Sequence, residues 1–246
     1  MASGAGILLY RQSFFELLLG MKTAILCLDI NPKSRRRNED LCIDSQERYA
    51  TAINSDFVLL RAAISKIHPT FDRFNHLKTF LRVYDRVLIL DRDIIIRRGV
   101  PNVFEHLNAP LAMTRVGEFD APVRQWGFDE LRSTYQLTDK DFHYDDGGFP
   151  YYYCCGMMLA SRDALDFFEV NFKEELYRPS LRHEQAYFNW VYNRVRPQIL
   201  DTTPQWHNWL IHPSDVGSMM STYFAHLFCG NVEHDATKTY YDNFVR

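Results

Sequence analysis

Runs of apolar residues alternate with polar segments through the first part of the chain, and their spacing predicts three buried strands. These runs cover residues 23–28 (Thr-Ala-Ile-Leu-Cys-Leu), 56–60 (Asp-Phe-Val-Leu-Leu) and 87–90 (Val-Leu-Ile-Leu). Continuous apolar runs of this length are typical of strands that are covered on both faces. We therefore expect these segments to form the interior of a sheet.

The segments between these strands show helical features. Asp44 or Ser45 can cap a helix that extends to about Ile53. After the break at His68-Pro69, apolar residues recur at helical spacing through residues 71–81. A strand-helix-strand-helix-strand order predicts an α/β fold with parallel strands and right-handed crossovers.

The second half gives a less regular pattern. We expect residues 115–149 to form loop and short helix, a region suited to binding an acceptor. No repeat or domain linker interrupts the chain, so the second half continues the same domain. The other expected elements are short helix 101–107, strand 111–114, strand 151–160, helix 164–172 and helix 184–195.

Two aspartates, Asp91 and Asp93, stand between apolar runs, directly after the third predicted strand. If the strand continues through them, both carboxylates point to one face and Arg92 to the other. Carboxylates on one face repel unless a cation lies between them, and a divalent ion carrying a diphosphate would meet this need. Such triplets also occur by chance in solvated loops. The buried strand before Asp91 favours a site, because ligands in α/β sheets bind at carboxyl ends of strands.

Composition limits the possible partners. The 246 residues are 46% hydrophobic and 15% aromatic, enough for one large folded domain. The 28 basic and 31 acidic side chains nearly cancel, so no overall field attracts nucleic acid or an anionic membrane. We expect a small or locally bound partner and no nucleic acid.

The cysteines indicate a reduced environment. The chain has 5 cysteines, an odd number, with no Cys-x-x-Cys spacing, and most lie within apolar runs. These features predict a cytoplasmic protein. Cys154 and Cys155 would face opposite sides of a strand, which argues against a zinc or redox site there.

Residues 1–20 form a separate feature, which we interpret as an N-terminal extension or an extra helix. Their apolar positions are interrupted by Arg11, Gln12 and Glu16, so the stretch is too short and too charged to span a bilayer. A peripheral membrane contact is the less favoured alternative. Met21 directly precedes the first strand and could itself be a start.

Several motifs in order resemble one known family. Residues 74–93, which end in Leu-Ile-Leu-Asp-Arg-Asp, are the most specific stretch, and residues 46–57 precede them. Tyr-Cys-Cys-Gly-Met-Met-Leu at 153–159 is similar to a strand usually written Phe-Asn-x-Gly-Val-Met. His-Glu-Gln-Ala at 183–186 is similar to an Asp-Gln-Asp helix, and Phe-Ala-His-Leu-Phe-Cys-Gly at 224–230 to a closing histidine motif. The chain thus resembles GT-A-fold glycosyltransferases, particularly the glycogenin and bacterial galactosyltransferase-like (family 8-like) retaining enzymes.

The resemblance implies one GT-A domain, a Rossmann-like nucleotide-diphospho-sugar transferase fold with a mixed, mainly parallel central sheet. This domain would cover residues 21–246, with a nucleotide-binding half at 21–114 and an acceptor-binding half at 115–246. Residues 1–20 would lie outside it.

The resemblance also implies roles for individual residues. Metal ligands for Mn²⁺ or Mg²⁺ would be Asp91, Asp93 and His226. Glu184 or Gln185 would face the anomeric carbon, and Lys78 would assist the leaving group. The expected donor-binding residues are Leu28, Asp29, Asn31, Arg73, Lys78, Asp91 and Arg92.

The sequence departs from the family pattern at three places. The closing motif has one residue more than usual between His226 and Gly230, and Lys238 is available as the downstream lysine that the family has. Cys154 or Cys155 replaces an asparagine that would contact the donor sugar, so the identity of that sugar stays open. Ala186 replaces the last carboxylate of the Asp-Gln-Asp motif. The family precedent favours retention, and a front-face displacement would need no enzyme nucleophile. If the enzyme inverts instead, a base could come from Asp120, Asp129, Asp145 or Asp146.

These features predict a metal-dependent glycosyltransferase that moves a sugar from a nucleoside-diphosphate donor, with uridine favoured, to a hydroxyl. The acceptor could be a glycan, a protein or a small molecule. The alternatives are a nucleotide-sugar-binding protein without transferase activity, or another metal-dependent nucleotidyl or phosphoryl enzyme. The latter would need a glycine-rich phosphate loop after the first strand or a nucleophilic aspartate, and residues 29–33 contain no glycine.

Overall fold

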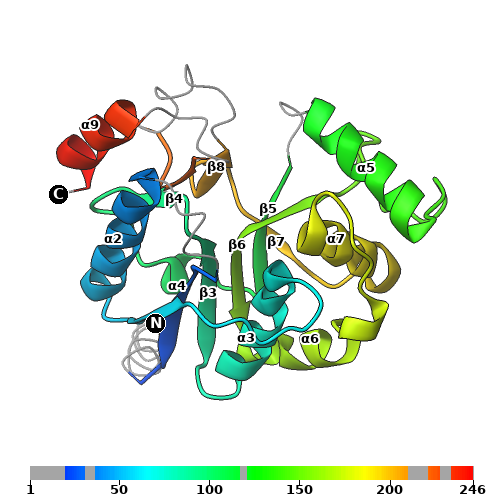
Figure 1. The fold of residues 1–246 in the computed structure, drawn as a ribbon, viewed down its shortest axis with the longest axis horizontal. Coiled ribbons are helices and arrows are strands. Elements are labelled where there is room, and N and C mark those ends of the chain that lie inside the picture. The colour runs from blue at the N-terminus through cyan, green and yellow to red at the C-terminus, as the bar shows by residue number, and fades with distance from the viewer. Residues whose placement is uncertain (1–19, 31–36, 117–120, 210–220, 228–233, 246) are drawn as a thin grey trace, which may run out of the picture.

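A computed structural model describes residues 20–30, 37–116, 121–209, 221–227 and 234–245 (Figure 1). The expected N-terminal extension therefore lies, except for Gly20, outside the described residues. Asn31 and Asp120 lie outside them as well.

The core of the fold is a six-stranded sheet with the order β2-β1-β3-β6-β5-β7. β1 is parallel to both β2 and β3, β6 is antiparallel to β3 and to β5, and β7 is parallel to β5. The expectation of an α/β fold with a mixed, mainly parallel sheet is confirmed. The strands are β1 (Thr23–Leu28), β2 (Asp56–Leu60), β3 (Arg86–Asp91), β5 (Leu111–Arg115), β6 (Tyr153–Ser161) and β7 (Leu200–Asp201).

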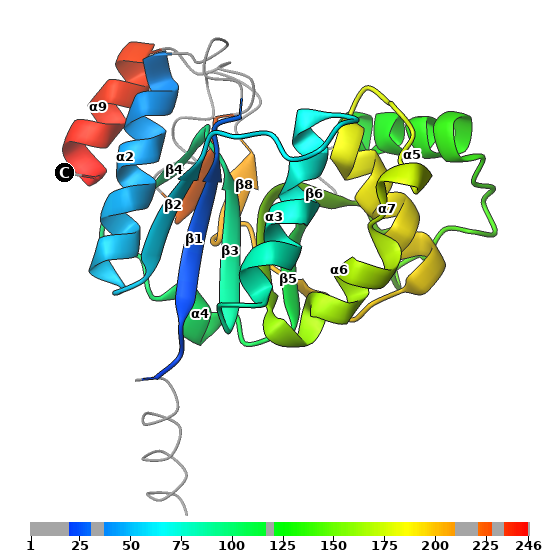
Figure 2. The same ribbon diagram turned by 60° about the horizontal axis from the view of Figure 1, so that its bottom comes forward.

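Helices cover both faces of this sheet, because successive side chains of each buried strand point to opposite sides. On β3, Ile89 belongs to a core cluster with α3 (Asp72–Leu81), α6 (Leu165–Asn171) and α7 (His183–Val195). Its neighbour Leu88 belongs to a second cluster with α2 (Arg37–Ala52) and α4 (Val103–His106). Figure 2 shows α2 and α3 on opposite sides of β1 and β3. Short 3₁₀ turns lie at Pro69–Phe71, Arg162–Ala164 and Glu174–Leu176.

A second, three-stranded sheet lies beside the first, with the order β4-β9-β8. β4 (Ile94–Ile96) pairs antiparallel with β9 (Phe224–His226), which pairs parallel with β8 (His207–Trp209). Ile94 is the register partner of His226. α9 (His234–Phe244) packs against α2, and residues of β4, β9, α2 and α9 share a third core cluster. This small sheet joins the late part of the chain to the end of β3.

The predictions for three regions need correction. α2 begins at Arg37 rather than at Asp44 or Ser45, because its inward face carries polar residues such as Glu39 and Gln46, which conceal the helical pattern. The region predicted as loop and short helix contains α5 (Ala121–Tyr135), a helix of 15 residues that packs against α7.

The third correction concerns Asp91, Arg92 and Asp93. β3 ends at Asp91, and Arg92 and Asp93 form a turn before β4, so strand alternation does not orient these side chains. The strands β7, β8 and β9 were not predicted, because they have only two or three residues, and the helix α9 was not predicted either.

No helix among the described residues is both long and apolar enough to cross a membrane.

Candidate active site

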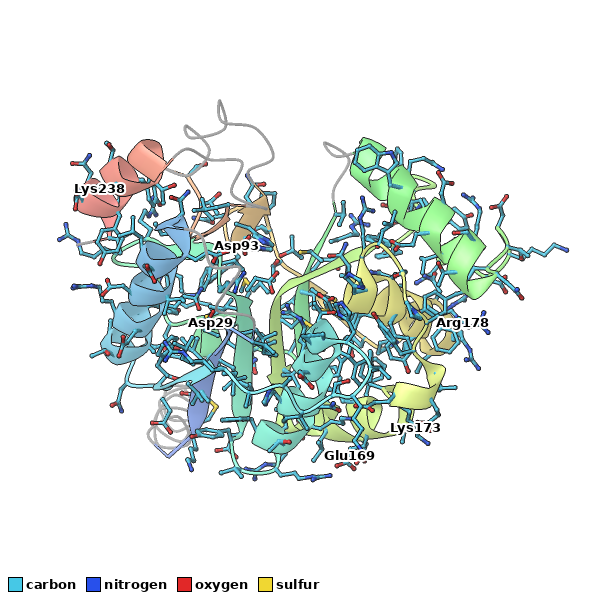
Figure 3. The ribbon with its side chains drawn as sticks, in the orientation of Figure 1. Asp29, Asp93, Glu169, Lys173, Arg178 and Lys238 are labelled. Carbon is cyan, nitrogen blue, oxygen red and sulfur yellow. The ribbon has the colours of Figure 1, made fainter. Side chains whose placement is uncertain are left out.

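The turn after β3 holds two aspartates at the carboxyl end of a central strand. Gln46, which is buried on α2, donates from Nε2 to the Asp91 carbonyl at 2.9 Å and to the Ile94 carbonyl at 2.8 Å. One side chain therefore satisfies the backbone on both sides of the turn and fixes its shape. Figure 3 shows Asp93 near this end of the central strands.

The pairing of β9 with β4 brings His226 to the same place. His226 Nε2 lies 3.1 Å from Asp93 Oδ1 and 3.7 Å from Asp91 Oδ2. Burial by itself lowers the pKa of His226, but the Asp93 carboxylate outweighs it and the pKa lies well above its usual value. The imidazole thus lies where positive charge is favoured, between two carboxylates.

These three side chains fit a divalent metal ion. One ligand atom of each lies within 4.8 Å of those of the other two, and Asp91 and Asp93 are partly exposed while His226 is buried. Two carboxylate oxygens and an imidazole nitrogen suit Mn²⁺, and Mg²⁺ when waters complete its coordination. The structure thus brings together the three residues that the sequence predicted as metal ligands.

Gly156 on β6 makes room for this group. A Cβ atom at Gly156 would lie 2.6 Å from Cε1 and 2.8 Å from Nδ1 of His226, and 3.1 Å from Asp91 Oδ2. The glycine is therefore needed by the site and not only by strand packing.

A buried arginine lies behind Asp91. Arg73, in the first turn of α3, donates from Nη2 to Asp91 Oδ1 and from Nη1 to the carbonyl of Cys155, and its Nη2 lies 3.8 Å from Glu184 Oε1. Burial opposes the charged form, yet the carboxylates of Asp91 and Glu184 raise the pKa of Arg73. Arg73 is therefore a permanent cation that orients Asp91.

Glu184 and Gln185 occupy the first turn of α7, and Glu184 lies beside Arg73. Burial raises the pKa of Glu184, Arg73 lowers it, and the net pKa lies above the usual value. Gln185 Oε1 accepts a hydrogen bond of 3.4 Å from Cys155 N. Asn189, one turn later, bonds to both N and O of Tyr153 and so fixes α7 on β6.

The predicted nucleoside end forms its own charged group. Asp29, fully buried after β1, accepts from Arg92 Nη1 at 3.3 Å and lies 3.5 Å from Arg61 Nε. Arg92 also contacts Glu39 on α2 at 3.2 Å. Leu28 packs against the sheet core. Asp29 and Arg92 thus join the ends of β1, β3 and α2.

Lys78 does not join these residues. Its Nζ donates to the Phe172 carbonyl at 3.0 Å, and burial lowers its pKa. Lys238, the available downstream lysine, lies on α9 at the periphery in Figure 3 and pairs with Asp242.

Two of the candidate bases for inversion, Asp129 and Asp145, have their partners outside this group. Asp129 is exposed and pairs with Arg132, whereas Asp145 caps the turn to Phe149 and contacts Arg115.

Sequence reasoning missed Gln46, Glu39 and His207. Their roles arise from contacts between segments far apart in the chain, and no local pattern marks them. His207 lies on β8 next to β9, with its ring stacked 5.5 Å from that of His226. The one available signal for His207 was a histidine in each of two short segments near the end of the chain.

No family model matches this chain, and no curated protein matches its sequence. Solved structures that share its fold include three glycosyltransferases. A glycosyltransferase involved in glycosylation of the major capsid of PBCV-1 has 11% identity and a TM-score of 0.57, over 89% of this chain and 98% of that one. The apo bifunctional glycosyltransferase WbbM has 13% identity and a TM-score of 0.57, and the match covers 92% of this chain and 50% of that one. Mouse xyloside xylosyltransferase 1, in its apo form, has 12% identity and a TM-score of 0.54, and the match covers 87% of this chain and 99% of that one.

These likenesses define the fold class. The chain has a GT-A-like α/β fold of the kind seen in these glycosyltransferases, with the convergent aspartates and histidine at the carboxyl end of β3. At 11–13% identity the likeness concerns the fold, and it does not identify a subfamily.

Proposed function

We propose that this protein is a metal-dependent glycosyltransferase that moves a sugar from a nucleoside-diphosphate donor, with UDP favoured, to a hydroxyl acceptor. The observation that carries the proposal is the convergence of Asp91, Asp93 and His226 at the end of β3 in a glycosyltransferase fold. An acidic pair that is partly exposed, beside a buried imidazole, suits an ion that faces a substrate phosphate.

The three residues would hold Mn²⁺ or Mg²⁺. The ion would supply Lewis-acid stabilisation of the negative charge on the departing diphosphate. Arg73 keeps the Asp91 carboxylate oriented through their buried ion pair. Gln46 keeps the backbone of the turn in place, so the ligands are positioned before substrate arrives.

Other residues would bind the donor at either end. Asp29 and Arg92, together with Leu28, would lie at the nucleoside end, since their strands β1 and β3 are adjacent and parallel. Glu184 and Gln185 would lie at the sugar end, next to Arg73 and Cys155. Lys78 has no role in this proposal, because its amine is held by the Phe172 carbonyl.

In the reaction, an acceptor oxygen forms a bond to the anomeric carbon as the bond from that carbon to the diphosphate oxygen breaks. The bonding electron pair leaves with the nucleoside diphosphate, and the acceptor proton passes to a leaving phosphate oxygen. We propose retention of configuration by this front-face route. The carboxylate of Glu184 lies 3.8 Å from Arg73 Nη2, and this ion pair favours an electrostatic role for Glu184 over that of a nucleophile.

The test is release of nucleoside diphosphate from a panel of nucleotide sugars, with Mn²⁺ or with chelator. We expect one donor to be turned over only with metal, and faster when a hydroxyl acceptor is present. Asp93→Asn should reduce turnover at least 100-fold, because one ligand loses its charge, while the melting curve stays that of a folded protein.

Asp163→Asn is the matched control, since Asp163 is exposed in the 3₁₀ turn that follows β6. It should retain full turnover. Binding of a nucleotide sugar with no product from any acceptor would indicate a binding protein instead. Absence of both release and thermal stabilisation by nucleotide with metal would overturn the proposal.

A further inference from the structure

A second group of ligand-type side chains lies behind the aspartates and includes a residue outside the proposed reaction. Cys154 on β6, His207 on β8 and His226 on β9 are all buried, and one nitrogen or sulfur atom of each lies within 4.8 Å of the others. The group contains only nitrogen and sulfur donors, unlike the oxygen-rich set at Asp91 and Asp93.

His207 gives independent support for a ligand at this position. Its side chain is fully buried, and Nε2 has no hydrogen-bond partner among the described residues. The other ring nitrogen, Nδ1, lies 2.7 Å from Thr114 Oγ1, which in turn lies 2.7 Å from Thr202 Oγ1. When His207 Nδ1 carries the proton and donates it to Thr114 Oγ1 in a hydrogen bond, Nε2 keeps a lone pair that can bind an ion in the group.

His226 completes the pattern. Its Nε2 lies 3.1 Å from Asp93 Oδ1, so an Nε2–H can donate to this carboxylate while Nδ1 serves as a ligand. Metal-binding histidines usually donate their second ring N–H to such an oxygen acceptor. Both histidines of the group therefore have an oxygen acceptor placed for the nitrogen that would not bind the ion.

We propose that Cys154 Sγ, His207 Nε2 and His226 Nδ1 form a buried site for a thiophilic ion such as Zn²⁺, separate from the carboxylate site. A thiolate and two imidazoles suit Zn²⁺ and leave one position for water, whereas Mn²⁺ and Mg²⁺ prefer oxygen. Bonds of about 2.0–2.3 Å draw the three atoms closer together, which small side-chain rotations achieve. Binding releases the thiol proton of Cys154.

The shared histidine couples the two sites. A neutral imidazole has one lone pair, so His226 binds either an ion at Asp91 and Asp93 through Nε2 or a thiophilic ion through Nδ1. Zn²⁺ in the buried site therefore withdraws one ligand from the catalytic ion and inhibits transfer. This second part rests on the proposed function, whereas the existence of the site does not.

Cobalt substitution tests the site without reference to activity. We expect Co²⁺ added to metal-free protein to give the near-ultraviolet thiolate-to-cobalt absorption band and the intense visible bands of four-coordinate Co²⁺. Both should be lost in Cys154→Ser and weakened in His207→Gln, and Zn²⁺ should displace them with one equivalent.

Cys155→Ser is the matched control, because the neighbouring thiol is equally buried but outside the group. It should keep the band, as should Asp93→Asn, which removes a carboxylate ligand of the other site. The proposal is overturned by absence of the band in the wild-type protein, or by its persistence in folded Cys154→Ser.

Competition tests the coupling. We expect Zn²⁺ to raise the Mn²⁺ concentration needed for half-maximal turnover at least 10-fold in the wild-type protein, and much less in His207→Gln. Equal inhibition of both proteins would refute the coupling. If no donor is turned over at all, the proposed function fails, and the cobalt band still decides whether the buried site exists.

Discussion

At the scale of single residues, Gly156 leaves the space that His226 occupies, because it carries no side chain. Gly156 lies on a central strand where any Cβ would overlap the imidazole and approach the Asp91 carboxylate. The candidate site therefore requires glycine at this position of β6.

Gly156→Ala should displace His226 and lower metal-dependent turnover more than 10-fold. Overpacking of this kind costs about 1–3 kcal/mol, so the protein should remain folded. Donor turnover across a Mn²⁺ titration, together with thermal unfolding, measures both effects. Wild-type turnover at every Mn²⁺ concentration would show that His226 does not need this position.

Arg73 is the second residue on which the site depends. Arg73→Gln leaves the carboxylates of Asp91 and Glu184 without their shared cation. We expect the free energy of unfolding to fall by about 3 kcal/mol, the lower end of the range for a broken buried pair, because Asp91 is partly exposed. Urea unfolding measures this change.

The double variant Arg73→Gln with Glu184→Gln separates charge from packing. Removing the second buried carboxylate should restore part of the lost stability, about 1 kcal/mol or more. No recovery would mean that packing of the guanidinium, and not its charge, stabilises this region.

At the scale of elements, α2 supports the turn that holds Asp91 and Asp93. Gln46 bonds to both ends of the turn, and Ser45 Oγ accepts from Ile96 N at 2.9 Å in the strand that follows. Adjacent residues of one helix thus fix the path from β3 into β4.

Gln46→Met should leave two buried carbonyl groups without their donor. We expect a loss of about 2–4 kcal/mol in the free energy of unfolding and weaker Mn²⁺ binding. Glu47→Met places the same side chain at the exposed next position and should change neither. Unaltered Mn²⁺ affinity in folded Gln46→Met would show that the turn holds its shape without α2.

Elements with strong local patterns could be predicted, and elements defined by contacts could not. β1 and β2 follow from their apolar runs, and α3 from helical spacing. The start of α2 was missed because Glu39 and Gln46 are polar residues buried by partners elsewhere in the fold. β8 and β9 are too short to show alternation, and they form only because β9 pairs with β4 and β8 pairs with β9.

The same division applies to the candidate site. Asp91 and Asp93 are conspicuous in the sequence, since charges follow a buried strand. The approach of His226 to them depends on the register of β4 with β9, which no local pattern specifies; only the resemblance suggested it. The same small sheet places His207 near Cys154, which lies on β6 of the large sheet.

At the scale of the whole molecule, ligand binding should be visible as stability. Nucleoside diphosphate and Mn²⁺ together should stabilise the folded state by about 2.7 kcal/mol when present at 100 times the dissociation constant. For a chain of this size each kcal/mol raises the melting temperature by about 2–4 °C. Differential scanning fluorimetry measures the shift.

Nucleoside diphosphate alone or Mn²⁺ alone should shift the melting temperature much less. Chelator should reverse the joint effect, because the diphosphate would bind through the ion. An equal shift with nucleotide alone in the presence of chelator would contradict metal-dependent donor binding.

The antiparallel pairing of β4 with β9 also has a consequence for biosynthesis. A chain emerging from the ribosome contains both aspartates well before the segment that carries His226. The first part of the sheet can assemble at that stage, yet its carboxylates still lack the imidazole. The growing polypeptide would thus have no transferase activity, and activity would appear only after β9 pairs with β4.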